Sequence, residues 1–120
     1  MSTDWSDSIV ISEVADEPAF SEEVNALIER ADAEEDARVP HVVLNLGQVT
    51  YLNSSNIAQL LRLHKRLTRC GRMLKLCSLN DEVWTLMLAT GLDKLLHFAP
   101  DPLTALAGLQ LEEAEEAGGS

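Results

Sequence analysis

The stretch VTYLNSSNI, residues 49–57, decides the fold, because the spacing of apolar residues changes within it. Before it, residues 41–46 (HVVLNL) form a β-branched and leucine-rich run of the kind that makes a buried strand. After Ile57 the spacing becomes helical. The positions that show it are Leu60, Leu61 and Leu67, with the amphipathic His64. The sequence therefore predicts a strand that passes into an amphipathic helix across residues 53–56.

Three residues at this junction can begin the helix. Asn and Ser are favoured N-caps because their side-chain oxygens accept the free amide hydrogens of the first turn, so Asn53, Ser54 or Ser55 can each serve. A serine hydroxyl is then expected at the helix N-terminus, on the surface. Backbone N–H groups and the helix dipole make such an end receptive to a phosphate, whether bound or covalently attached to a serine.

Strands and helices alternate along the rest of the chain. Strands are predicted at residues 9–14, 41–46, 73–79 and 95–98, and helices at residues 21–33, 54–70, 81–90 and 103–109. Asn80 is a good N-cap for the third of these helices, and Gly91 ends it. Because this alternation requires crossover connections, the sequence predicts an α/β fold. We expect a mostly parallel or mixed central sheet of about four to five strands, covered by about four helices.

The length of 120 residues fits one domain, which we place at residues 9–111. Residues 1–8 are predicted to be flexible, and residues 112–120 to be a disordered acidic tail. The N-terminus has no signal-peptide pattern, and no apolar run approaches the roughly 20 residues of a membrane span. We therefore expect no membrane insertion and a cytoplasmic location.

The formal net charge of −11 argues against nucleic-acid binding, because phosphate contacts supply most of that affinity. The basic residues are nevertheless clustered. Six of the nine lie between residues 62 and 75, namely Arg62, Lys65, Arg66, Arg69, Arg72 and Lys75. The cluster is interpreted first as a solvated helix face with cations near the helix C-terminus, and second as a docking patch.

The sequence offers little for catalysis, metals or cofactors. The serines lack the G-x-S-x-G pattern, and the spacing of His41, His64 and His97 places no base beside them. Glycine-rich phosphate loops and calcium-loop patterns are also missing, and Cys70 and Cys77 lack zinc spacing, so both are expected to be reduced. We therefore expect no enzyme activity, no catalytic residue, no metal and no cofactor. His64 and Trp84 are interpreted as packed residues of the core or its edge.

Two pieces of the chain resemble the STAS domain of bacterial anti-sigma factor antagonists. The first is residues 42–46 followed by residues 49–56, similar to that family's apolar strand, short loop and Asp-Ser-Ser-Gly helix start. The second is residues 79–84 leading to Thr-Gly-Leu at 90–92 and Leu-Leu-His-Phe at 95–98, similar to the family's later helix, turn and final strand. The resemblance covers residues 41–106 and implies a STAS-like single domain that acts in transcription regulation.

The resemblance also implies a phosphorylation switch. In the family the first serine of the motif is phosphorylated by a kinase that is itself the anti-sigma factor, and this serine aligns with Ser54. A serine phosphatase would reverse the modification. The implied partner-binding residues are Asn53, Ser54, Ser55, Asn56, Gln59 and Arg62.

Asn53 and Asn56 depart from the motif, since they stand where Asp and Gly are usual. Asn53 keeps a capping group but lacks the negative charge that a kinase can read. The alternative is therefore a STAS scaffold or transporter-associated subunit that is not phosphorylated, in which the two serines only cap the helix. The sequence leaves the oligomeric state open.

Overall fold

The computed structural model describes residues 3–5 and 8–119, and the side-chain environments of residues 8–112. Its strands are β1 (Thr3–Trp5), β2 (Ile9–Ala15), β3 (His41–Gln48), β4 (Leu74–Cys77) and β5 (His97–Ala99). Its helices are α1 (Ala19–Ala33), α2 (Ser54–Arg69), α3 (Asp81–Thr90), α4 (Leu92–Leu95) and α5 (Pro102–Gly119), with a 3₁₀ turn η1 at Asp36–Arg38. The five strands form one sheet in the order β1-β2-β3-β4-β5. Only β1 is antiparallel to its neighbour, which confirms the predicted α/β class and the mostly parallel sheet.

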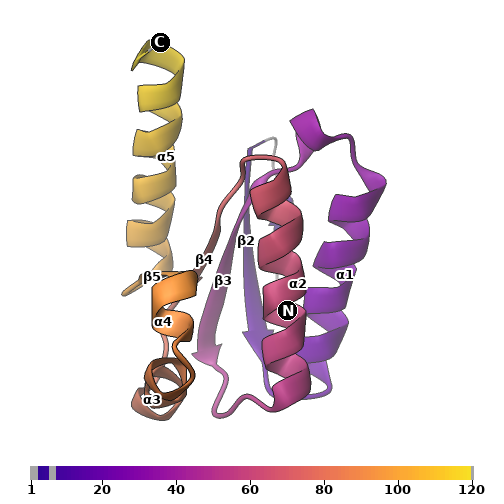
Figure 1. Cartoon of the computed structure of the whole chain (residues 1–120), viewed down its shortest axis with the longest axis vertical. Helices are drawn as coiled ribbons and strands as arrows, with labels where there is room; N and C mark the ends of the chain where they lie inside the picture. The colour runs from indigo at the N-terminus through magenta and orange to yellow at the C-terminus, as the bar shows by residue number, and fades with distance from the viewer. Residues whose placement is uncertain (1–2, 6–7, 120) are drawn as a thin grey trace.

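Helices cover both faces of the sheet, α1 and α2 on one face and α5 on the other (Figure 1). The central strand β3 explains why both faces need cover. Its residues Val42, Val43 and Leu44 are all buried, although successive side chains of a strand point to opposite faces. The continuous apolar run that predicted this strand is therefore the signature of a strand between two layers.

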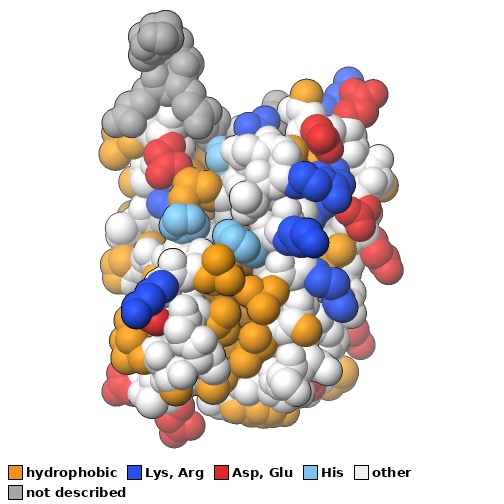
Figure 2. Space-filling model, in the orientation of Figure 1, with side chains coloured by type: hydrophobic (Ala, Val, Ile, Leu, Met, Phe, Trp, Pro, Cys, Tyr) orange, Lys and Arg blue, Asp and Glu red, His pale blue; other side chains and the backbone are white. Residues whose placement is uncertain are grey.

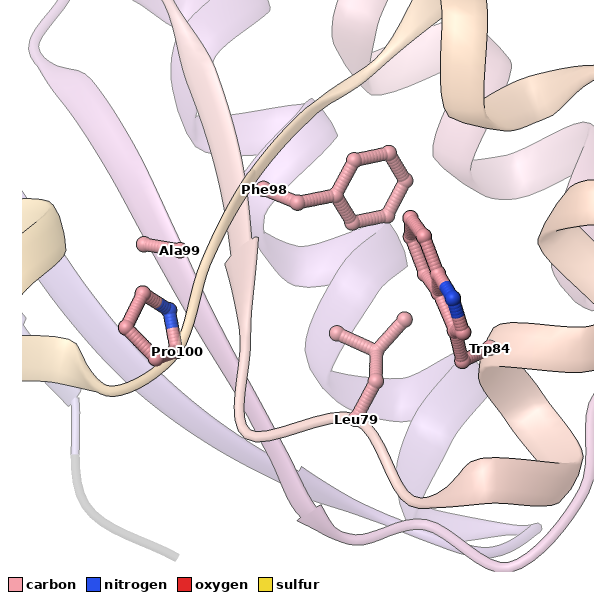
Figure 3. A pocket seen from close by; sticks show the side chains of 5 residues that line it. All are labelled: Leu79, Trp84, Phe98, Ala99 and Pro100. Atoms are coloured by element: carbon pink, nitrogen blue, oxygen red, sulfur yellow. The ribbon is translucent and has the colours of Figure 1, made fainter.

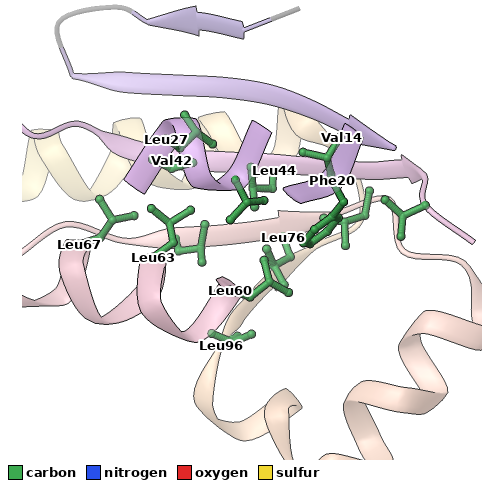
Figure 4. Close-up of a cluster of buried hydrophobic side chains, with 14 of the residues drawn as sticks. Val14, Phe20, Leu27, Val42, Leu44, Leu60, Leu63, Leu67, Leu76 and Leu96 are labelled. Atoms are coloured by element: carbon green, nitrogen blue, oxygen red, sulfur yellow. The ribbon is translucent and has the colours of Figure 1, made fainter. Parts of the chain in front are cut away.

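The larger core lies between the sheet and the α1–α2 layer (Figure 4). Side chains at helical spacing on α2 fill it, namely Leu60, Leu63 and Leu67, each fully buried. A smaller cluster under α5 contains Ile9, Val43, Cys77, Ala105 and Leu109. Because α2 is anchored along its length, its first turn is held at the carboxyl end of β3.

Five of the six basic residues of the cluster fall into two groups in the structure, and the sixth, Lys75, is half-buried on the strand β4. Arg66 is buried, forms ion pairs with Asp32 at 3.0 Å and Asp36 at 3.2 Å, and donates to the Ala31 carbonyl at 2.8 Å. In the same way, Arg72 Nε donates to the Val39 carbonyl at 2.6 Å. These two residues attach the end of α2 to the α1–β3 connection, so the interpretation as a solvated face is wrong for them. Arg62, Lys65 and Arg69 are exposed, as expected.

The structure corrects the predicted chain ends. Residues 3–5 form a strand rather than a flexible segment, while residues 1, 2, 6 and 7 lie outside the described part. The predicted disordered tail instead continues α5 as far as Gly119, with residue 120 outside the description. The prediction gave weight to the repulsion among the glutamates, whereas Leu, Glu and Ala are among the strongest helix formers. The helix predicted at residues 103–109 is accordingly too short.

The middle of the chain follows the prediction more closely. The helix of residues 81–90 has the expected bounds, with Asn80 Oδ1 accepting from Val83 N at 2.8 Å and Gly91 in the left-handed conformation at φ 76°. The short helix α4 was not predicted. Within the described residues, no helix combines the length and the apolar character that crossing a membrane requires.

Candidate functional site

The first turn of α2 is closed by a reciprocal pair of asparagines. Asn53 Oδ1 accepts from Asn56 N at 2.8 Å, and Asn56 Oδ1 accepts from Asn53 N at 3.0 Å. This is a capping box built from two amides. Of the three residues that the sequence allowed as N-cap, the structure uses Asn53.

Because Asn53 caps the helix, the serine hydroxyls are not needed for capping. Ser54 is the first residue of α2, and both Ser54 and Ser55 are exposed. Among the residues that the structure describes, neither hydroxyl takes part in a hydrogen bond between side chains or with the backbone. The interpretation of the serine pair as a helix cap is therefore wrong, and Ser54 presents an accessible nucleophilic oxygen at the positive end of a helix.

A polar chain runs inward from this turn. Asn56 Nδ2 donates to Gln59 Oε1 at 3.4 Å, Gln59 Nε2 donates to Ser21 Oγ at 2.9 Å, and Ser21 Oγ donates to Glu17. Asn56 is 1% exposed and Gln59 is 7% exposed. The structure thus corrects the predicted role of these two residues, because buried side chains that join α2 to α1 cannot also form a contact surface for a partner. Arg62, two turns along α2 from Ser54, is exposed.

The connection between β2 and α1 was not predicted to take part in the site. Asp16 accepts from Thr50 twice, from the backbone N at 2.8 Å and from Oγ1 at 2.6 Å. These two bonds join the residues that follow β2 to those that follow β3. The position of Asp16 directly after a predicted strand could have indicated its role. The carboxyl ends of adjacent parallel strands meet at one edge of a sheet, and binding residues are often found there.

Several carboxylates lie near the loop that leads into α2. Hydrogen bonds from Thr50 lower the pKa of Asp16, and hydrogen bonds from Ser21 lower the pKa of Glu17, so both are ionised at neutral pH. An open cavity of about 360 Å³ next to Thr50 is lined by Asn80, Asp81 and Glu82. Asn53 lacks the charge of an aspartate, but the adjacent loops supply negative charge at the same edge.

The sequence of this chain matches the model of a known protein family. Residues 6–105 match the model of the STAS domain. The chain belongs to the STAS domain family. The match extends from before β2 into α5, so it includes the α2 N-terminus and both loops that border it.

Solved STAS structures share the fold at low sequence identity. A candidate anti-sigma factor antagonist from Thermotoga maritima superposes with a TM-score of 0.75 at 15% identity, covering 91% of this chain and 93% of that one. An anti-sigma-factor antagonist domain protein from Planctomyces limnophilus gives 0.73 at 16% identity, covering 91% and 97%. The STAS domain of a SulP transporter from Vibrio cholerae gives 0.72 at 15% identity, covering 90% and 85%.

Away from the α2 terminus, the STAS domain carries a shallow apolar pocket of about 300 Å³ (Figure 3). It is lined by Leu79, Trp84, Phe98, Ala99 and Pro100. The Trp84 and Phe98 rings meet edge to face, with centroids 5.2 Å apart and an interplanar angle of 80°. Trp84 is 38% exposed, so its interpretation as a core residue is wrong. Helix α3 packs on the core through its other face, which carries the buried Val83 and Met87. Trp84 lies outside that face, so an apolar residue on this helix need not be a core residue.

The histidines of this STAS domain lie apart from the serines. His41 is buried, and its Nδ1 accepts from Met73 N at 2.9 Å. This hydrogen bond joins the start of β3 to the residue before β4, so the role of His41 is structural. His64 is half-buried on α2, as predicted, and burial followed by the charge of His97 lowers its pKa. Throughout the described part of the chain, His, Cys, Asp and Glu form no group of three that could hold a metal ion.

The capping box of the STAS domain should make a measurable contribution to the free energy of unfolding. Asn56→Ala removes one half of the box and the first link of the inward polar chain, so we expect a loss of about 1–2 kcal/mol in the free energy of unfolding. Urea denaturation monitored by circular dichroism measures this loss. Ser55→Ala, an exposed change in the same turn, is the matched control and should stay within about 0.5 kcal/mol of wild type. Equal stability of the two variants would contradict the assigned cap.

The lowered pKa values of Asp16 and Glu17 predict how stability depends on pH. The folded state binds these two protons less tightly than the unfolded chain, whose carboxylates titrate near 3.8 and 4.5. Their contribution is therefore complete above the ordinary pKa values and is lost as the pH falls through the lowered ones. Urea denaturation at a series of pH values from 7 to 3 should show stability falling below about pH 4.5, and Glu17→Gln should reduce that fall. A variant with the wild-type pH dependence would contradict the prediction.

Proposed function

We propose that this STAS protein is a non-enzymatic, cytoplasmic regulator of the anti-sigma factor antagonist type. It binds an anti-sigma factor serine kinase through the surface around the α2 N-terminus, and phosphorylation of Ser54 releases that partner. A cognate serine phosphatase restores the binding form. The observation that carries the proposal is that Ser54 is exposed at the start of α2, while Asn53 and Asn56 perform the capping.

In the proposed phosphorylation, this protein supplies the attacking hydroxyl and the kinase supplies the base. Ser54 Oγ attacks the γ-phosphorus of ATP, the bond to the β-phosphate oxygen breaks, and ADP leaves. The hydroxyl proton passes to a base of the kinase. The phosphoserine then lies where first-turn N–H groups and the helix dipole favour negative charge. In the reverse step, water attacks the phosphorus under the phosphatase, and the Ser54 oxygen takes back a proton as inorganic phosphate departs.

The negative charge of the phosphoryl group explains why the partner would be released. Asp16 and Glu17 already make this edge negative, and a phosphoryl group adds about 1.5 to 2 further negative charges at neutral pH. A partner surface that packs against a neutral hydroxyl must then desolvate a dianion without a matching cation. The partner loses affinity while the domain itself stays folded.

The competing function is that of a STAS scaffold or transporter-associated subunit. This alternative is supported by the fold, because a SulP transporter domain superposes nearly as well as the anti-sigma factor antagonist proteins do. A scaffold would bind its partner whether or not Ser54 carries a charge.

The test maps the phosphate. Wild type, Ser54→Ala and Ser55→Ala are incubated with ATP and a candidate kinase, chosen from ATPases encoded beside this gene, and the products are analysed by mass spectrometry. We expect phosphate on Ser54 in wild type and in Ser55→Ala, and none in Ser54→Ala. Phosphate on Ser55 alone would refute the assignment, and unmodified protein with unchanged partner binding would favour the scaffold.

A further inference from the structure

The outer side of α2 carries a row of cations that the fold does not use. Arg62, Lys65 and Arg69 are exposed, follow one another at helical spacing, and form no ion pair within the described residues. Their neighbour Arg66 instead pairs with carboxylates of α1 and η1. The sequence contains 20 Asp and Glu against 9 Lys and Arg, so carboxylates are plentiful. These three residues, called the basic row, therefore stand apart from the acids of their own chain.

The stability of α2 does not explain the basic row. The helix dipole favours cations in the last turn, which accounts for Arg69. Arg62 and Lys65 lie before that turn, where the effect of the dipole has fallen off. Like charges three and four residues apart on a helix also repel each other. The row therefore costs the isolated protein some stability, and binding to another molecule would explain it.

An apolar strip runs along α2 beside the basic row. It consists of Ile57 and Leu61, followed at the same helical spacing by the amphipathic His64, and all three side chains are half-buried. At about 3.6 residues per turn, the strip lies between the buried face that carries Leu60 and Leu63 and the outward basic row. Figure 2 shows hydrophobic side chains between α2 and the α3–α4 region and blue side chains along α2. The accessible part of α2 thus combines an apolar strip with a parallel row of positive charge.

The strip and the row together indicate the shape and charge of a binding partner. From Ile57 to Arg69 the helix rises about 18 Å, which is about three turns. A second helix lying along α2 can place one face on the strip and the adjacent face on the row, whereas the side chains of an extended strand alternate between opposite faces. Electrostatic complementarity requires carboxylates on that adjacent face. An anionic membrane fits less well, because the net charge of −11 repels it.

We propose that the apolar strip and the basic row of α2 form a docking surface for an acidic amphipathic helix of a protein partner. The apolar face of that helix covers the strip, and its carboxylates pair with the basic row. The surface begins about one turn after Ser54 and continues to the end of α2. It therefore goes beyond the proposed switch, and binding to it does not require phosphorylation.

A pair of stapled synthetic peptides tests the surface. The first is a helix of about twelve residues with leucines on one face and glutamates beside them, and the second has glutamine in place of each glutamate. In fluorescence anisotropy titrations at low salt, wild type should bind the glutamate peptide about tenfold more tightly than the glutamine peptide, and added salt should reduce this preference. Nuclear magnetic resonance titration of the labelled protein should show shift changes of backbone amides in residues 57–69.

Variants of the basic row show whether its charge is responsible. Lys65→Glu with Arg69→Glu should abolish the preference for the glutamate peptide, as should Lys65→Gln with Arg69→Gln, which introduces no repulsion. Lys65→Arg with Arg69→Lys keeps both charges and should bind like wild type. Arg38→Glu, an exposed reversal on η1, is the matched control and should keep the preference. Circular dichroism at increasing temperature establishes that each variant is folded.

Three results would overturn the proposal: a wild type that binds neither peptide, equal binding of the two peptides, or shift changes confined to other parts of the chain. Vesicles of phosphatidylcholine and phosphatidylserine provide the comparison with a membrane. If wild type binds these vesicles and neither peptide, the basic row serves a lipid surface instead. Because no kinase or ATP is present, these outcomes are independent of whether Ser54 is phosphorylated.

Discussion

Phosphorylation of Ser54 should weaken binding to the partner kinase by about a hundredfold or more. Leaving one charge buried and unpaired in an interface commonly costs several kcal/mol, and about 1.4 kcal/mol corresponds to tenfold in affinity. Ser54→Asp should reproduce part of the effect, because it carries a smaller charge in a different geometry. Isothermal titration calorimetry with the purified kinase measures the affinity of each form.

The controls for this experiment lie in the same helical turn. Ser54→Ala should bind like the unmodified protein and should not respond to ATP, while Ser55→Ala should keep the full switch. Circular dichroism should show that wild type, Ser54→Ala and Ser55→Ala are equally folded, because neither hydroxyl takes part in the Asn53–Asn56 cap. If the kinase binds Ser54→Asp as tightly as wild type, the release mechanism is wrong.

The second large effect concerns the core that holds α2 in place. Leu63→Ala should lower the free energy of unfolding by about 2–5 kcal/mol, since it removes a fully buried side chain and leaves a cavity between α2 and the sheet. That loss is a large fraction of the roughly 5–15 kcal/mol that stabilises a typical domain. Urea denaturation of the purified variant gives the value.

An exposed leucine provides the matched comparison. Leu88 is 51% exposed on α3, and Leu88→Ala should change stability by no more than about 0.5 kcal/mol. Similar losses in the two variants would mean that α2 contributes much less to the core than its burial indicates.

The parts of the fold that could be predicted are those specified by neighbouring residues. The switch of periodicity after residue 52 and the Asn80 and Gly91 signals each depend on a few adjacent positions, and the structure has these boundaries where they were expected. The end of α5 was misjudged because two local rules conflict at residues 112–117. Helix propensity favours continuation and glutamate repulsion opposes it, and the sequence alone does not weigh one against the other.

In the candidate site, too, the features set by neighbouring residues could be predicted and those set by distant residues could not. Ser54 was placed at the helix start by its immediate neighbours. The bond from Thr50 to Asp16 and the chain from Asn56 through Gln59 to Ser21 join residues that are more than 30 positions apart. Such contacts depend on which strands lie side by side, so spacing within one segment could not reveal that Asn56 and Gln59 point inward.

The Asn53–Asn56 capping box has a consequence for the lifetime of the protein in the cell. Proteases degrade a folded domain largely through its transiently unfolded population, which the free energy of unfolding sets. Because the hydroxyl of Ser54 is outside the cap, adding or removing its phosphate should change that population little. Modified and unmodified molecules would then be turned over at similar rates. The signal would be carried by the ratio of two equally durable forms, and one pool of protein could pass through many cycles without new synthesis.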